Sequence, residues 1–441
     1  MHPAGLIAID KRQPLQFKPL ERAIMKNTDT QKKTIRSRLF SATFYGRPLS
    51  FMLAPLGLQA ESPVLQEIGP LAFLLVMLAL FVMVAPAKAQ DPLKFAGDFR
   101  VRHETTTKQE PGALPDIRDP RNREVVRFRF GMSKKINGLF NFGARLATGS
   151  PDDPNTTDIT IGDFANDLTI SLDRAYMELA YQNFFLTGGK FANPFRTTEM
   201  VWDGDVNPQG FGASYTLAGS PTVVPKLTGV YYVIDEQTSR DDSYMLGGQL
   251  QFAINASDNL SLTLAGAYYD YTIKSLVNAN SGDIGSNYLN PAGDGYLSDF
   301  DLIDAIAAID YRGFGEQWPL RVVGNFVKNR GAVDGGQGEQ DAGLNVELYL
   351  GKTTKIHDWR LQYAFTKTEA DAVLAAFSHD NTTLTTNYIQ HTLGVDYVAH
   401  ENMILNVTLY RYRRNELEAV ETDGFENDSF MRVRLNALVN F

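Results

Sequence analysis

The most regular pattern in the sequence lies in its last eleven residues, where apolar and polar positions alternate. The apolar positions are Met431, Val433, Leu435, Ala437, Val439 and Phe441. The positions between them hold Arg432, Arg434, Asn436 and Asn440, with one break at Leu438. A period of two residues predicts a β-strand with one apolar and one polar face. Such a strand fits the wall of a membrane barrel, but an edge strand of a soluble sheet has the same pattern.

The same alternation recurs throughout the chain from residue 90 onward. In one example, Val126, Phe128 and Phe130 alternate with Arg127 and Arg129. We count about sixteen such segments and predict between fourteen and eighteen strands. The segments are residues 93–106, 124–136, 138–150, 167–182, 184–192, 208–219, 227–236, 242–254, 259–273, 299–312, 318–328, 342–352, 356–367, 386–399, 402–414 and 429–441.

The links between these segments alternate in length. Short links such as Asn137-Gly138 and Asn183 are followed by longer polar ones. The longer links are residues 107–123, 151–166, 193–207, 237–241, 274–298, 329–341, 368–385 and 415–428. Short turns at one end and longer loops at the other are typical of outer-membrane barrels, whereas a soluble multi-sheet protein has no reason to alternate them. The sequence therefore predicts an all-β fold, a transmembrane antiparallel β-barrel over residues 90–441.

In such a barrel the apolar face of each strand meets lipid and the polar face lines a water-filled lumen. Tyrosines also gather near the ends of two predicted strands, and they are Tyr268, Tyr269, Tyr271, Tyr410 and Tyr412. Because aromatic residues collect at both interfaces of a membrane barrel, we interpret these tyrosines as part of an aromatic girdle.

The first 89 residues have a different character. Residues 71–85 form a run of 15 apolar residues that leads into Pro86-Ala87-Lys88-Ala89. This is typical of a secretory signal cleaved after Ala89. The alternative is a membrane anchor, which needs about 20 apolar residues, and Pro70 and Pro86 make this run too short. The stretch before the run is unusually long, so Met25 is a candidate start, and we expect residues 1–89 to be absent from the working protein.

Composition excludes several classes of protein. The mean hydropathy of −0.22 excludes a polytopic helical membrane protein. The absence of cysteine excludes disulfides and thiolate metal sites. Residues 1–89 hold 11 of the 42 basic and 5 of the 51 acidic residues, which leaves 31 and 46 in residues 90–441 and a formal charge of −15. Such an acidic balance argues against a nucleic-acid partner.

Five stretches resemble the bacterial putative-porin family of outer-membrane proteins. They are GDFRVRHE at 97–104, RLATGS at 145–150, LDRAYMEL at 172–179, GGKFANPF at 188–195 and VWDGDVNPQG at 201–210. The resemblance implies a passive channel in the bacterial outer membrane for small hydrophilic solutes, without a reaction or a cofactor. It also implies contact with outer-membrane lipid and lipopolysaccharide, and a C-terminal strand ending at Phe441 that the barrel-assembly machinery reads. Similarity to the general porins implies a homotrimer.

Seven arginines lie at the polar positions of the alternating pattern in neighbouring predicted strands. They are Arg100, Arg102, Arg127, Arg129, Arg145, Arg432 and Arg434. Since a closed barrel pairs its last strand with its first, we expect one contiguous arginine wall inside the lumen, where it avoids the cost of about 2 to 4 kcal/mol for arginine against lipid. The wall either steers anions and dipolar solutes or pairs with inward carboxylates such as Asp98, Glu104 and Asp173 and stiffens the barrel.

The third long loop, Asn193 to Asn207, carries the remaining candidate site residues. Similarity to the general sixteen-stranded porins implies that this loop folds inward and presents Glu199, Asp203 and Asp205 to the arginine wall as a constriction. The alternative is an exposed loop that packs on the rim. The run from Asp203 to Asn207 is also similar to the start of a calcium loop, but Pro208 stands where glycine is required, so we expect no metal site.

Two other classes of function remain open. A lipid-hydrolysing barrel would need a serine and a histidine on one outward rim, with an amide or carboxylate to orient the histidine. None of the five histidines after residue 90 lies in a recognisable nucleophile motif. A surface adhesin would instead use its outer loops to bind a partner. We interpret Asp152, Asp153 and Asp158 as solvated loop acids that divalent ions could link to lipopolysaccharide.

Overall fold

The computed structural model describes residues 92–107, 121–162, 164–220, 222–279, 284, 286–336, 338–415 and 429–441. Within these ranges the chain forms sixteen long strands and one strand of two residues, β4. The strands are β1 Lys94–Thr106, β2 Arg121–Lys135, β3 Phe140–Thr148, β4 Ile159–Thr160, β5 Ile170–Tyr181, β6 Phe184–Lys190, β7 Gln209–Thr216, β8 Val223–Asp235, β9 Ser243–Ser257, β10 Leu260–Thr272, β11 Phe300–Tyr311, β12 Leu320–Asn329, β13 Ala342–Gly351, β14 Trp359–Thr368, β15 Tyr388–His400, β16 Met403–Arg414 and β17 Phe430–Asn440.

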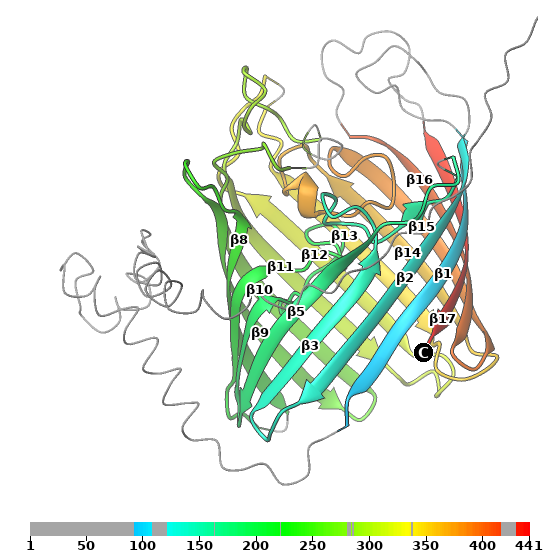
Figure 1. Ribbon diagram of the computed structural model, residues 1–441. Helices are drawn as coiled ribbons and strands as arrows, with labels where there is room; N and C mark the ends of the chain where they lie inside the picture. Colours follow the sequence, from blue (N-terminus) through cyan, green and yellow to red (C-terminus); the bar gives the residue numbers. More distant parts are fainter. Residues whose placement is uncertain are drawn as a thin grey trace, which may run out of the picture. The chain divides into compact units, whose positions relative to one another are not determined.

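The long strands close into one antiparallel barrel (Figure 1). Each strand pairs with the next along the chain, except that β3 pairs with β5 because β4 is a short addition to β2. Closure is made by β1 and β17, which pair from Asp98 opposite Asn440 to Thr106 opposite Arg432. The barrel prediction is confirmed, and each of the sixteen predicted segments corresponds to one long strand.

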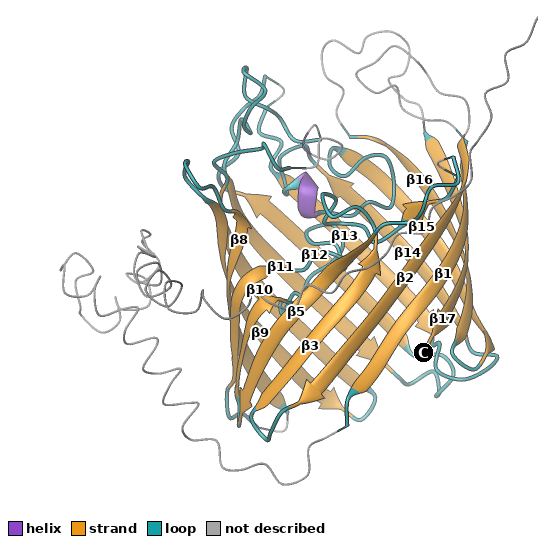
Figure 2. Cartoon of the chain, in the orientation of Figure 1, coloured by secondary structure: helices purple, strands orange, loops and turns teal. Residues whose placement is uncertain are grey.

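Loops and turns gather at the two ends of the barrel, as Figure 2 shows. The longer links lie at the upper end of that view and the shorter ones at the lower end, and the 3₁₀ turn η2, Ala375–Phe377, lies among the longer links. None of the helical structure in the described ranges is long and apolar enough to cross a membrane.

The two faces of the wall differ as the alternation predicts. Large apolar side chains such as Phe99, Leu250 and Leu435 are exposed on the outside of the barrel. Outward apolar and inward polar positions let a barrel stand in lipid while it encloses a polar interior.

The predicted tyrosine girdle is wrong for four of its five members. Only Tyr268 is on the outward face, with 48% of its surface exposed. Tyr269, Tyr271, Tyr410 and Tyr412 are buried inside the barrel. These four tyrosines point inward because they occupy the positions that alternate with the outward residues of β10 and β16. Inside the barrel they pack against other apolar side chains.

Candidate functional site

The strand register brings the seven predicted arginines together on the inner wall. Across the closing seam, Glu104 lies opposite Arg434 and Thr106 lies opposite Arg432. On the other side of β1, Arg100 lies opposite Arg127 and Asp98 lies opposite Arg129. Arg145 follows on β3, opposite Arg174 of β5. The arginine wall therefore extends over four neighbouring strands, β17, β1, β2 and β3, and Arg174 continues the row on β5.

Glu104 is the centre of the charge network at the seam. Its carboxylate accepts a hydrogen bond of 2.7 Å from Nε of Arg434 and one of 2.7 Å from Nε of Arg123. Arg432 lies 3.5 Å from the same carboxylate. Only 2% of the Glu104 surface is exposed. One carboxylate thus neutralises part of three guanidinium charges. Arg123 was not among the predicted site residues, although it has the inward parity of Arg127 and Arg129.

Two further inward carboxylates pair with the wall. Asp98 accepts hydrogen bonds from Nε of Arg127 at 2.9 Å and from Nε of Arg129 at 2.7 Å. Asp173, on β5, pairs with Arg145 and accepts a hydrogen bond of 2.6 Å from Asn207. These contacts are those of the stiffening arrangement anticipated for the wall, and they hold neighbouring strands together side chain to side chain.

Asp158 is not a solvated loop acid, in contrast to the sequence interpretation. It lies in the loop 149–169, beside β4, and pairs with Arg100 and with Arg102, the latter at 2.6 Å. Burial alone would raise the pKa of Asp158, but Arg102 and Arg100 outweigh that effect and lower it to about 2. The loop therefore folds inward onto the arginine wall.

The loop 191–208, between β6 and β7, also enters the barrel. Trp202 is 98% covered, and its ring lies 5.9 Å from that of Tyr232 and 6.2 Å from that of Tyr269. The Gln249 side chain accepts a hydrogen bond from the Arg196 amide and donates one to the Arg196 carbonyl. Thr198 hydrogen-bonds Asn325 of β12. Apolar packing and these polar contacts fix the loop against the inner face of β8 to β12.

The three acids of this loop have different surroundings. Asp205 pairs with Arg129 at 2.8 Å and accepts a hydrogen bond of 2.9 Å from Thr157. Glu199 accepts a hydrogen bond of 2.8 Å from Asn381 rather than from an arginine. Glu199 is exposed to solvent, whereas only 6% of the Asp203 surface is exposed, and burial together with the Glu199 charge raises the pKa of Asp203 well above its usual range. Of the three acids, Asp205 is the one that forms an ion pair with the arginine wall.

The sequence analysis did not predict that a further loop, residues 369–387 between β14 and β15, enters the barrel. Its apolar run is Ala372, Val373, Leu374, Ala375, Ala376 and Phe377, and every one of these side chains is at least nine-tenths covered. An apolar run of six residues inside a predicted outer loop was the available signal, because exposed loops are ordinarily polar.

The described residues contain no group of three or more metal-ligating side chains. In the stretch similar to a calcium loop, the Asp205 carboxylate is occupied by Arg129 and Thr157.

At the other end of the barrel, Phe441 exchanges backbone hydrogen bonds of 2.8 and 3.0 Å with Gly97, so the last residue is joined to β1.

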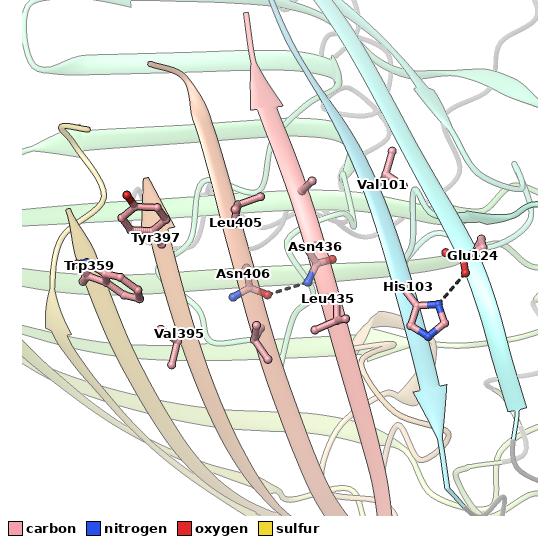
Figure 3. A pocket seen from close by; sticks show the side chains of 12 residues that line it. Val101, His103, Glu124, Trp359, Val395, Tyr397, Leu405, Asn406, Leu435 and Asn436 are labelled. Carbon is pink, nitrogen blue, oxygen red and sulfur yellow. Dashed lines mark hydrogen bonds and ion pairs between the residues drawn. The ribbon is translucent and has the colours of Figure 1, made fainter. Parts of the chain in front are cut away.

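A depression of about 540 Å³ lies on the outward face of the wall, away from the arginines (Figure 3). Apolar residues such as Val101, Leu405 and Leu435 line most of it. At its polar end, Nδ1 of His103 lies 2.7 Å from the Glu124 carboxylate. This depression faces the lipid side of the barrel and does not contribute to the lumen.

The comparison with protein families confirms the resemblance seen in the sequence. Residues 90–288 match the family model described as Putative porin. The match extends beyond the five resembling stretches and includes β1 to β10. No curated protein matches the sequence.

Solved structures of outer-membrane proteins are similar in fold. The high-pH structure of Pseudomonas putida OprB has a TM-score of 0.51 at 12% identity, over 79% of this chain and 94% of that chain. Salmonella typhi OmpF, in complex with daunomycin, has a TM-score of 0.48 at 12% identity, over 80% of this chain and 100% of that chain. A trimer form of Vibrio cholerae OmpT has a TM-score of 0.45 at 10% identity, over 80% and 100%. From the family match over residues 90–288 and the closed barrel, we conclude that this chain resembles the putative porin family and forms a porin-like channel in the bacterial outer membrane.

Proposed function

We propose that the channel conducts small hydrophilic solutes by passive diffusion, without catalysing a reaction, and that it prefers anions. The observation that carries this proposal is the charge balance of the arginine wall. The seven arginines of the wall and the neighbouring Arg123 share five carboxylates through the ion pairs seen among the described residues. The wall therefore keeps an excess of positive charge, and such a wall attracts anions and repels cations in a narrow aqueous passage.

The inward loop 191–208 is proposed to act as a constriction. Its contacts with Gln249 and, through Thr198, with Asn325 on one side, and the Asp205–Arg129 pair on the other, support this position across the barrel interior. Glu199 and Asp203 are proposed to set the electrostatics of this region. Because burial favours the neutral form of Asp203, this acid opposes the charge of the arginine wall less than an ionised acid would.

The test is planar-bilayer recording under a salt gradient, with Arg100, Arg102, Arg127 and Arg129 all changed to Gln. We expect discrete ohmic steps from the native channel, an anion-selective reversal potential, and a shift towards cations in the variant. A matched comparison uses two double variants. Arg127→Gln with Arg129→Gln removes two charges from the wall, whereas Arg321→Gln with Arg360→Gln removes two inward charges that pair with Asp310 and Asp396 elsewhere in the barrel.

The outcomes separate the parts of the proposal. If the native protein is folded but gives no conductance, the channel function is wrong and lipid hydrolysis or adhesion should be tested next. If conductance is present but the wall variants keep the native reversal potential, the arginines serve the structure alone. Equal shifts in the two double variants would show that total lumen charge matters and the arginine wall does not.

The processing and partners of the protein are proposed on separate grounds. We infer that residues 1–89 are a signal with an extended beginning, removed before assembly, and the family match that starts at residue 90 supports this. Mass spectrometry of the envelope protein should find an N-terminus at or near Gln90.

The C-terminal strand, with Phe441, is proposed to be read by the barrel-assembly machinery. Contact with lipopolysaccharide and assembly into a homotrimer are proposed as well, the second to be tested by native mass spectrometry.

A further inference from the structure

The loop 369–387 is held inside the barrel by polar contacts as well as by its apolar run. The Asn287 side chain donates hydrogen bonds to the carbonyls of Ala370 and Val373, at 2.7 and 2.9 Å, and accepts one of 2.9 Å from the Ala375 amide. The Asp371 carboxylate accepts a hydrogen bond of 2.6 Å from Ser298. One amide side chain thus satisfies three backbone groups, which gives this loop a defined shape.

The same loop is joined directly to the loop 191–208. The Asp203 amide donates to the carbonyl of Phe377 at 2.8 Å, and the His379 amide donates to the carbonyl of Glu199 at 3.1 Å. The rings of Phe377 and Trp202 lie 5.5 Å apart. Backbone pairing and ring packing between two loops from distant parts of the sequence make them one unit.

Asn381 connects this two-loop unit to the arginine wall. Its side-chain oxygen accepts a hydrogen bond of 2.7 Å from Arg434, and its side-chain nitrogen donates one of 2.8 Å to Glu199. Its backbone carbonyl accepts a hydrogen bond of 2.9 Å from Arg432. An amide suits this position because it offers one acceptor to the cation and one donor to the carboxylate.

We propose that the loop 369–387 is a second constriction loop, docked on the arginine wall by Asn381, which acts as the positioning residue for the width of the passage. The inference rests on the proposed channel function. It assigns Arg432 and Arg434 a second role, since they hold the loop as well as contributing charge. The other two inward loops are held in the same manner, through Asp158 on Arg102 and Asp205 on Arg129.

A thiol-protection experiment tests docking without relying on conductance. The chain contains no cysteine, so Val373→Cys introduces one reporter at a side chain with 0% exposure. In the protein purified from outer membranes, we expect a water-soluble maleimide to react slowly with this thiol. Adding Asn381→Leu should raise the rate of thiol modification about tenfold or more, because the docked state of the loop loses hydrogen bonds to charged groups.

The width of the passage is measured by the largest neutral polyethylene glycol that enters the channel and lowers its conductance. We expect Asn381→Leu to admit larger polymers than the native channel. Asn406→Leu is the matched control, because Asn406 is an inward amide on β16 whose hydrogen bonds join it to Asp396, Thr408 and Asn436, which are residues of the barrel wall. This control should leave both the polymer limit and the protection of the Val373→Cys thiol unchanged.

A rescue experiment separates positioning from general destabilisation. Asn381→Asp keeps the acceptor for Arg434 but sets a carboxylate against Glu199, so the loop should be released and the polymer limit should rise. Adding Glu199→Gln restores a donor opposite the new acceptor, and the native limit should return. Full protection of the thiol in Asn381→Leu, or no response of the polymer limit to either variant, would overturn the proposal. A native protein without conductance but with normal thiol protection would refute the channel function while leaving the docking of the loop established.

Discussion

Glu104 of β1 and Arg434 of β17 form an ion pair of 2.7 Å across the seam where the first and last long strands meet. The pair is covered, with 2% of each residue's surface exposed. Arg123 and Arg432 share the same carboxylate. A single acid therefore links β17, β1 and β2 at the place where the barrel closes, and the seam depends on side-chain charge as well as on the backbone ladder.

Glu104→Gln should weaken the seam and increase anion selectivity. Three guanidinium groups would lose their shared carboxylate, and removing one partner of a buried pair costs about 3 to 5 kcal/mol. We expect a lower urea midpoint for loss of the folded band on unheated gels, and a reversal potential shifted towards anions. Glu347→Gln is the control, because Glu347 is an inward acid that hydrogen-bonds Asn345 and Tyr349. Matching midpoints for the two variants would contradict the role given to Glu104.

Gly97→Ala should impair closure at the end of the chain. A Cβ atom at residue 97 would lie 2.7 Å from the Phe441 ring and would also meet the Arg129 carbonyl. Forcing a methyl group into such a site costs about 1 to 3 kcal/mol. We expect a lower refolding yield and a lower urea midpoint. Gly324→Ala provides the comparison, since a Cβ atom there would meet nothing within 4 Å, and it should fold as the native protein does.

The sequence was sufficient to predict the inward and outward faces of the barrel wall, because the face of each strand residue depends only on its position in the local alternation. The alternation of Arg432 and Arg434 with Met431 and Val433 gives each side chain its face without knowledge of any distant residue. The prediction of a tyrosine girdle was wrong because it was based on residue type and not on the alternation of inward and outward positions along the strand. Leu262 and Leu264 already put Tyr269 on the inward face, because it lies an odd number of positions away from them.

The inward loops depended on contacts that no local pattern contains. Ser378 donates a hydrogen bond to the carbonyl of Met200, which lies 178 residues earlier in the chain. Asp158 meets Arg100, which lies 58 residues earlier in the chain, because the loop 149–169 folds inward. Loop length and polarity do not specify such pairings, which explains why Asp158 was interpreted as solvated and why the loop 369–387 was missed.

Trp202→Ala should widen the passage by loosening both constriction loops. The indole packs on Tyr232, Tyr269 and Phe377, and removing a buried aromatic side chain costs about 3 to 5 kcal/mol. We expect a larger single-channel conductance and a wall that remains folded. Trp318→Ala is the control, because Trp318 lies in the turn 312–319 with 39% of its surface exposed. A native conductance in Trp202→Ala would show that the loops do not limit flow.

The pairing of Asp158 with Arg100 and Arg102 should respond to acid only at low pH. Its pKa is lowered from 3.8 to about 2, so the stabilisation is complete above about pH 4 and is lost as the pH falls through about 2. Asp158→Asn frees both guanidinium groups at every pH and should shift the reversal potential towards anions.

The difference in reversal potential between the native channel and Asp158→Asn should stay constant from pH 7 to about 4 and shrink as the pH falls towards 2, where the native carboxyl becomes neutral as well. Comparing the two proteins at each pH cancels the titration of other acids, which both proteins share. Asp152→Asn serves as the control, because Asp152 lies in the same loop but is exposed, and it should match the native channel throughout. A difference that was already half lost near pH 3.8 would mean that Asp158 has an ordinary carboxyl pKa and is not held by the arginine wall.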